Sequence, residues 1–223
     1  MLKDIVIQAL KQVQSDCSSL TKSAYPTVHN RGMDNKHLAS LVERRLTGVA
    51  SSYGTTLVSE AFDVRPEQST QELPFRRFTT HFGNVWLLPD SLKTANRTHR
   101  QNLVKMVSLW REEYGYVIQP NDCLVLVCDH WFSRISSSQQ LMDWWLNRFP
   151  DDFASYVEQG ILLAPSEGEK LDELLSPMSL SPCYKSHAHP IKKMAPMAIR
   201  LVSSAMSICT PSMSAFRLLG NFF

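Results

Sequence analysis

The 223 residues are 43% hydrophobic and 20% charged, a balance typical of a folded globular protein that excludes a fibrous or wholly disordered chain. No run of about 18 apolar residues occurs, and the charged start lacks the apolar core of a secretory signal, so we expect no transmembrane segment. Five scattered cysteines, an odd number, favour reduced thiols and therefore a cytoplasmic protein.

The net charge of +2 conceals blocks of opposite sign. Residues 65–111 carry eight basic and three acidic side chains, and residues 112–175 carry three basic and twelve acidic ones. Residues 176–223 carry five basic side chains and no acidic one. These blocks predict basic and acidic surfaces that either neutralise each other within the fold or attract a partner.

Two amphipathic helices are predicted at the start of the chain. Apolar residues recur at helical spacing over residues 2–20 and again over residues 38–49. Asp34 or Asn35 is suited to begin the second helix.

Three strands are predicted next. Residues 55–64 have the β-branched and aromatic content of a strand. Residues 75–82 and 84–88 predict a hairpin around Gly83, and the sequence Pro-Asp-Ser at 89–91 is expected to end its second arm.

The central part of the chain alternates helix, strand and helix. A helix is predicted over residues 98–114, and the apolar run 124–128 is typical of a strand that is buried on both faces. Ser136 and Gln139 match the capping box S-x-x-Q, which predicts that a further helix begins there. A second such box, Ser166 with Glu169, predicts a helix start before Leu171.

The predicted fold is α/β (or α+β), with a central mixed sheet of about four strands flanked by helices. We expect this domain to occupy residues 1–175. Residues 176–223 are rich in Ser, Pro and Met, and we expect them to form a poorly ordered basic extension. A basic, moderately apolar extension is suited to peripheral contact with an anionic membrane or to a groove on a partner.

The predicted order of elements resembles the helix–three strands–helix–strand core of restriction-endonuclease-like nucleases. The resemblance implies a divalent cation such as Mg²⁺, held by an acidic residue on one strand and by an acid two residues from a lysine on the next. The catalytic candidates under this hypothesis are Glu60, Asp63, Asp90 and Lys93, and the metal ligands are Asp63 and Asp90. Glu43 would add a further carboxylate. The Asp90–Lys93 spacing is one residue too long for the pattern, so a relative without catalytic activity is an alternative.

Asp129 and His130 form a second catalytic candidate, because they stand where the buried strand ends. Side chains at the carboxyl ends of strands often border a ligand crevice, and histidine serves as a general acid or base near neutral pH. Adjacent strand residues point to opposite faces, however, so a structural role for both is the alternative.

Basic residues interleaved with aromatic ones predict a nucleic-acid surface, because cations bind phosphates and aromatic rings stack on bases. An ordinary solvated helix face is the alternative. The candidate residues are Arg76, Arg77, Arg97, Arg100, Lys105 and Arg111.

Two weaker patterns complete the set. Cys183, His187 and His189 are residue types that bind zinc, but no C-x-x-C pair accompanies them, which favours the alternative of a disordered polar tail. Of the adjacent Trp144 and Trp145, one is expected to point partly outward and to mark a protein interface.

The sequence contains no G-x-x-x-x-G-K-S/T, no G-x-G-x-x-G and no G-x-S-x-G, which disfavours nucleotide hydrolases, dinucleotide dehydrogenases and α/β-hydrolases. The leading hypothesis is a nucleic-acid-associated protein with a nuclease-like core, with or without catalysis. The alternatives are a protein-interaction or regulatory module that uses an acidic, Trp-rich helical face, and a small-molecule enzyme with its site at Asp129 and His130.

Overall fold

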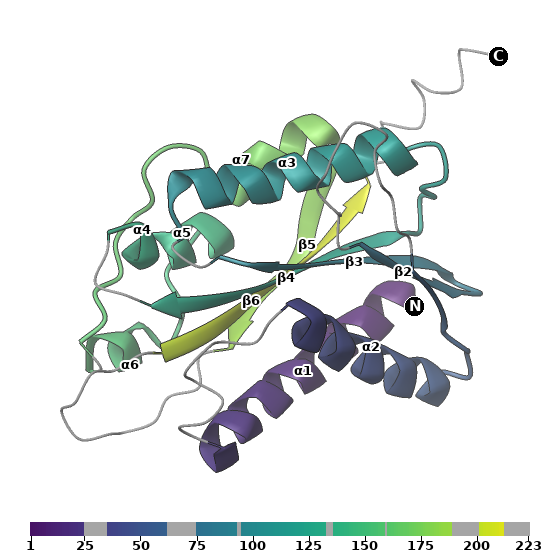
Figure 1. Ribbon diagram of the computed structural model, residues 1–223, viewed down its shortest axis with the longest axis horizontal. Helices are drawn as coiled ribbons and strands as arrows, with labels where there is room; N and C mark the ends of the chain where they lie inside the picture. Colours follow the sequence, from purple (N-terminus) through teal and green to yellow (C-terminus); the bar gives the residue numbers. More distant parts are fainter. Residues whose placement is uncertain are drawn as a thin grey trace.

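A six-stranded sheet lies between two layers of helices in the computed structural model (Figure 1). The structure describes residues 1–24, 35–61, 75–92, 95–132, 136–158, 160–188 and 201–211. Among these residues, none of the helices combines the length and the apolar composition that crossing a bilayer requires.

The first four strands and the helices around them confirm the predicted α/β fold. The sheet has the strand order β1-β2-β3-β4-β6-β5, in which β1–β2 and β2–β3 are antiparallel and β3–β4 is parallel. Helix α3 makes the crossover that two parallel neighbours require. These five elements are β1 (Val58–Ala61), β2 (Arg76–Thr80), β3 (Gly83–Ser91), α3 (Arg97–Tyr114) and β4 (Cys123–Phe132).

The segment 176–223 contributes two strands that the sequence did not predict. Strand β6 (Leu201–Pro211) pairs antiparallel with β4, and β5 (Leu180–Ala188) pairs antiparallel with β6. A register shift between Pro182 and Tyr184 interrupts the pairing of β5 beside its proline, as expected where a residue lacks an N–H donor. The boundary predicted after residue 175 stays a prediction.

Two apolar cores lie on the two faces of the sheet. One is covered by α1 (Leu2–Ala24) and α2 (Asn35–Ser52), and the other by α3 together with the short helices α5 (Leu141–Leu146) and α7 (Leu171–Leu175) (Figure 1). Strand β4 contributes side chains to both cores. The first core, under α1 and α2, contains Cys123, Val125 and Val127, and the second core, under α3, α5 and α7, contains Leu124, Leu126 and Cys128. The predicted strand buried on both faces is therefore confirmed.

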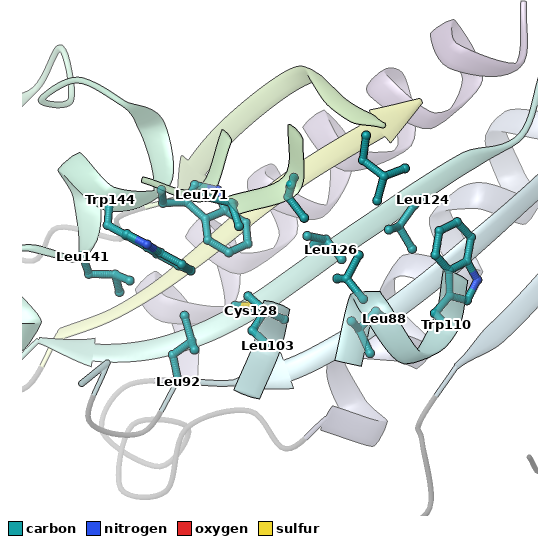
Figure 2. Close-up of a cluster of buried hydrophobic side chains, with 14 of the residues drawn as sticks. Leu88, Leu92, Leu103, Trp110, Leu124, Leu126, Cys128, Leu141, Trp144 and Leu171 are labelled. Carbon is teal, nitrogen blue, oxygen red and sulfur yellow. The ribbon is translucent and has the colours of Figure 1, made fainter. Parts of the chain in front are cut away.

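The second core joins the sheet to α3, α5 and α7 through large side chains (Figure 2). Trp110 of α3 meets Trp86 of β3 edge to face, with ring centroids 5.7 Å apart. Trp144 and Trp145 of α5 are both buried in this core, so the prediction that one of them is exposed is wrong. Helix α5 has neighbours on more than one side, because it contacts both α7 and β5.

Strand β3 continues past the predicted stop at residues 89–91. Strand β2 pairs with β3 only as far as Leu87, so Pro89 lies in a part of β3 that pairs with β4 alone. Proline is tolerated in such an edge-like position because a missing N–H donor costs no ladder bond there. The hairpin itself is confirmed, with residues 81–82 forming its turn before Gly83.

A buried carboxylate ties the hairpin to the start of β4. Asp122 is 1% exposed and accepts hydrogen bonds from the backbone N–H groups of Asn84 (2.8 Å) and Gln119 (3.1 Å) and from the indole Nε1 of Trp86 (3.1 Å). Gly83 lies at φ 132°, and a side chain there would meet the Asn121 carbonyl oxygen at 3.2 Å. The close approach of the two segments therefore depends on a glycine and on Asp122.

Three short helical segments complete the described chain. They are α4 (Ser136–Gln139), which begins at the predicted capping serine, α6 (Phe153–Glu158), and a single 3-10 turn over Ser176–Met178.

Candidate functional site

A cleft of about 320 Å³ opens beside the first turn of α3, between that turn, α5 and the loop that leads into α7. Its volume is at the lower end of the range for small-molecule sites, roughly 300–1,000 Å³. The lining combines charged and amide side chains with an apolar floor: Arg97, Arg100, Gln101, Gln140, Trp144, Glu167, Gly168, Glu169 and Leu174.

The first wall of the cleft is the amino-terminal turn of α3. Asn96 caps this helix by accepting a hydrogen bond from the His99 backbone N–H, and Arg97 follows as the first helical residue with an exposed side chain. Arg100 is 7% exposed, and its guanidinium carbon lies 5.4 Å from the centroid of a Trp144 ring. Burial lowers the pKa of Arg100, but arginine starts so high that it stays charged. This wall is therefore cationic, and the positive end of the helix dipole adds to it.

The second wall is the loop before α7, which Asp143 of α5 holds in place. The Asp143 carboxylate accepts hydrogen bonds from the Ser166 backbone N–H (2.8 Å) and hydroxyl (3.0 Å) and from the Lys170 ammonium (3.1 Å). Burial raises the pKa of Asp143, but the bonds from Ser166 and Lys170 outweigh burial and leave this pKa below its usual value. Between the anchored Ser166 and Lys170 lie Glu167, Gly168 and Glu169. The two glutamates form an acidic rim of the cleft, and the anchors on either side fix its position.

The predicted capping box of Ser166 and Glu169 is not formed. Ser166 is used by Asp143, and α7 begins instead at Leu171, where the Lys170 backbone N–H donates to the Glu173 carboxylate at 3.0 Å. The helix therefore begins five residues beyond Ser166, because the hydrogen bonds to Asp143 hold the intervening loop against α5.

The charges of the two walls do not neutralise each other. No ion pair among the described residues involves Arg97, Glu167 or Glu169, although all three line the same cleft. Elsewhere most described arginines pair with carboxylates, as Arg76 does with Glu43 at 2.6 Å. The cleft therefore presents unneutralised charge of both signs to a ligand.

His130 is a buried structural group rather than an exposed acid or base. It is 1% exposed, with Nδ1 2.5 Å from the Leu92 carbonyl oxygen and Nε2 2.7 Å from the Ser138 hydroxyl. A carbonyl oxygen can only accept, so Nδ1 carries the proton and Nε2 accepts from Ser138. Burial and the nearby Arg100 charge together lower the pKa of His130 to about 4, although the hydrogen bond to the Leu92 carbonyl opposes this shift. The neutral ring thus fastens α4 to the end of β4.

Asp129 and His130 do not form a dyad. Residues alternate between the two faces along β4, so these neighbours point to opposite sides of the sheet. Asp129 is buried opposite Ser91 of β3. Burial raises the pKa of the neighbouring Cys128 thiol, and the negative charges of Asp90 and Asp129 raise it further.

Glu60 and Asp90, two of the carboxylates predicted for the nuclease-like site, are not close together in the structure, and the predicted metal pair of Asp63 and Asp90 stays a prediction. Glu60 is opposite Arg77 and forms an ion pair with it, and Arg77 is opposite Trp86. Asp90 lies four residues beyond Trp86, about 13 Å further along the sheet at the usual strand rise. Asp63 and Lys93 lie outside the described residues. No cluster of three or more metal-binding side chains occurs within the described part of the chain.

The basic residues predicted to bind nucleic acid do not all lie on the same side of the sheet. Arg76 pairs with Glu43 on the α2 side of the sheet, whereas its neighbour Arg77 lies against Trp86 on the α3 side, 5.5 Å from the ring centroid. Arg97 and Arg100 belong to the cleft. The remaining two lie further along α3, as exposed Lys105 and half-buried Arg111.

The zinc candidates are only partly described. His187 Nε2 lies 3.2 Å from an Asp152 carboxylate oxygen, Cys183 is a free thiol at the bulge of β5, and His189 lies outside the described residues. A partner for His187 on the acidic block explains its position without a metal.

No protein-family model, curated protein or solved structure matches the chain. The cleft therefore has to be interpreted from its own residues. Sequence reasoning identified Arg97 and Arg100 but assigned them to another ligand, and it missed the acidic rim. The available signal was the pair of glutamates around Gly168, directly before a predicted helix.

Proposed function

We propose that this protein binds a small anionic ligand in the cleft beside α3. The observation that carries the proposal is the exposed guanidinium of Arg97. It lies in the first turn of the 18-residue helix α3, and it has no ion-pair partner among the described residues. Arginine presents several N–H donors in a plane, which suits a carboxylate. The positive end of the helix favours the same charge.

The floor of the cleft adds an apolar requirement. Trp144 and half-buried Leu174 are the apolar residues of the lining, and Gln101 and Gln140 supply amide donors and acceptors. Ligand sites commonly combine an apolar surface with a few polar groups that fix orientation. A small carboxylate with an aromatic or aliphatic body fits this arrangement best.

The test is calorimetric or NMR titration with 3-phenylpropanoate, which combines one carboxylate with one phenyl ring. Arg97→Ala is expected to weaken binding by about tenfold, because it removes a charge-assisted hydrogen bond. Arg111→Ala is the matched control, since it removes the same side chain from the other end of the same helix. Equal affinity of the Arg97→Ala and Arg111→Ala proteins, or no binding by the wild type, would contradict the proposal.

A nucleic-acid-associated protein with a nuclease-like core is the second candidate function. It is favoured by the element order, which runs α2, three strands, α3 and β4, as the resemblance implies. The expected result is binding of a labelled duplex or single strand that weakens steeply as salt rises, because phosphate contacts release counterions. Absent or salt-insensitive binding counts against this candidate.

A further inference from the structure

We infer that the ligand of the cleft is a small zwitterion, with its carboxylate at α3 and its ammonium group at the acidic rim. The inference rests on the proposed function and deepens it by adding the second charge. Arg97 and Arg100 belong to one wall of the cleft, and Glu167 and Glu169 belong to the wall that faces a ligand from the loop before α7.

The acidic rim selects against ligands that carry only negative charge. Two glutamates line a cleft of about 320 Å³, so a dianion such as a phosphate ester would gain from the arginines and lose to the glutamates. A ligand with one charge of each sign gains at both walls. Complementary charge arrangements of this kind decide specificity more than they decide raw affinity.

Both walls are fixed before the ligand arrives. The rim is held through Ser166 and Lys170 by the Asp143 carboxylate, and the Ala164 backbone N–H donates to the Gln139 carbonyl oxygen at 3.0 Å. The α3 wall is fixed by its Asn96 cap and by Arg100 against Trp144. A preorganised pair of walls keeps the opposite charges apart, which reduces the ordering cost of binding.

The apolar floor and the volume limit the ligand to a single amino acid or a molecule of similar size with an apolar side chain. Trp144 is 2% exposed, so the ligand body meets the surface of a packed core and not a free aromatic platform. Stacking of a nucleobase between exposed aromatic rings is therefore disfavoured at this cleft, because such stacking needs an accessible ring face.

Three matched probes test the inference on the full chain: phenylalanine, 3-phenylpropanoate, which lacks the ammonium group, and phenethylamine, which lacks the carboxylate. Phenylalanine is expected to bind about fivefold more tightly than 3-phenylpropanoate, the upper end of what one solvent-exposed charge pair contributes. Phenethylamine is expected to bind most weakly, since it loses the contacts to Arg97. The double variant Glu167→Gln/Glu169→Gln should bind phenylalanine and 3-phenylpropanoate equally. Glu158→Gln, an exposed glutamate on α6 outside the cleft lining, should keep the preference.

The outcomes separate the two proposals. If 3-phenylpropanoate binds as tightly as phenylalanine, or if the preference survives in the double glutamine variant, the zwitterion inference is overturned while the anion site stands. If neither probe binds, or if Arg97→Ala has no effect on either, the proposed function fails as well. Folding of each variant is checked by its unfolding midpoint, which these exposed substitutions should leave close to that of the wild type.

Discussion

Replacing Asp122 with alanine is expected to lower the free energy of unfolding by at least about 3 kcal/mol. The substitution removes one carboxylate and leaves the N–H donors of Asn84, Trp86 and Gln119 without their acceptor. Each buried donor left without an acceptor costs about 1–3 kcal/mol. The loss also separates the β2–β3 hairpin from the loop before β4, which this carboxylate joins.

Urea unfolding at neutral pH measures this loss. Asp151→Ala is the matched control, because the Asp151 side chain is 84% exposed and its ion pair is with the exposed Arg148. Such a surface substitution should change stability by no more than about 0.5 kcal/mol. Asp122→Asn keeps one acceptor oxygen and should fall between the two. If Asp122→Ala unfolds at the same urea concentration as Asp151→Ala, the proposed role of this network is wrong.

Lowering the pH from 6.5 to 4 is expected to remove about 3 kcal/mol of stability through His130. The pKa of His130 is about 4 in the folded protein, whereas an unfolded histidine has a pKa of about 6.5. Between these values the unfolded chain binds a proton that the folded chain does not, so the free energy of unfolding falls as the pH falls. This stability is fully present above pH 6.5 and fully lost below pH 4.

Unfolding curves at several pH values measure this slope with His130→Gln and His81→Gln as the comparison pair. His130→Gln should be less stable at neutral pH and nearly flat between pH 6.5 and 4, since the titrating group is gone. His81 is exposed in the hairpin turn, so His81→Gln should keep the wild-type slope. The lowered pKa of Asp143 removes stability mainly below pH 4, as an unfolded aspartate takes up its proton, so it adds little to the slope between pH 6.5 and 4. A wild-type slope in the His130→Gln protein would refute the assignment.

Local sequence patterns predicted the elements whose side chains alternate or recur regularly. The apolar run of β4, the hairpin and helix α3 are confirmed because each carries its own burial pattern. Strands β5 and β6 were not predicted, because their segments contain prolines and many polar residues and so lack a clear apolar strand pattern. The pairing of β6 with β4 also joins segments that are distant in the sequence. The burial of both Trp144 and Trp145 likewise depends on neighbours that α5 acquires only in the fold.

The candidate site could not be predicted, because no single segment contains it. Its two walls come from α3 and from the loop before α7, and the anchor of that loop, Asp143, lies 23 residues before Ser166. The charge blocks were visible in the sequence, and part of their charge is neutralised internally: Arg76 pairs with Glu43, and Lys185 pairs with Asp172 at 2.7 Å. Only the fold distinguishes these paired charges from Arg97, Glu167 and Glu169.

The central claim is that the cleft beside α3 binds a small carboxylate, with the carboxylate group at Arg97 and the apolar body against Trp144. The most direct measurement is a titration of the labelled protein with 3-phenylpropanoate, followed through the tryptophan indole signals in NMR spectra. The signal of Trp144, identified with Trp144→Phe, should move in a saturable way, while those of Trp86 and Trp110 stay in place because they lie buried outside the cleft. The Arg97→Ala protein should need about tenfold more ligand for the same change. A Trp144 signal that stays in place, or one that moves equally in the Arg97→Ala protein, would contradict the claim.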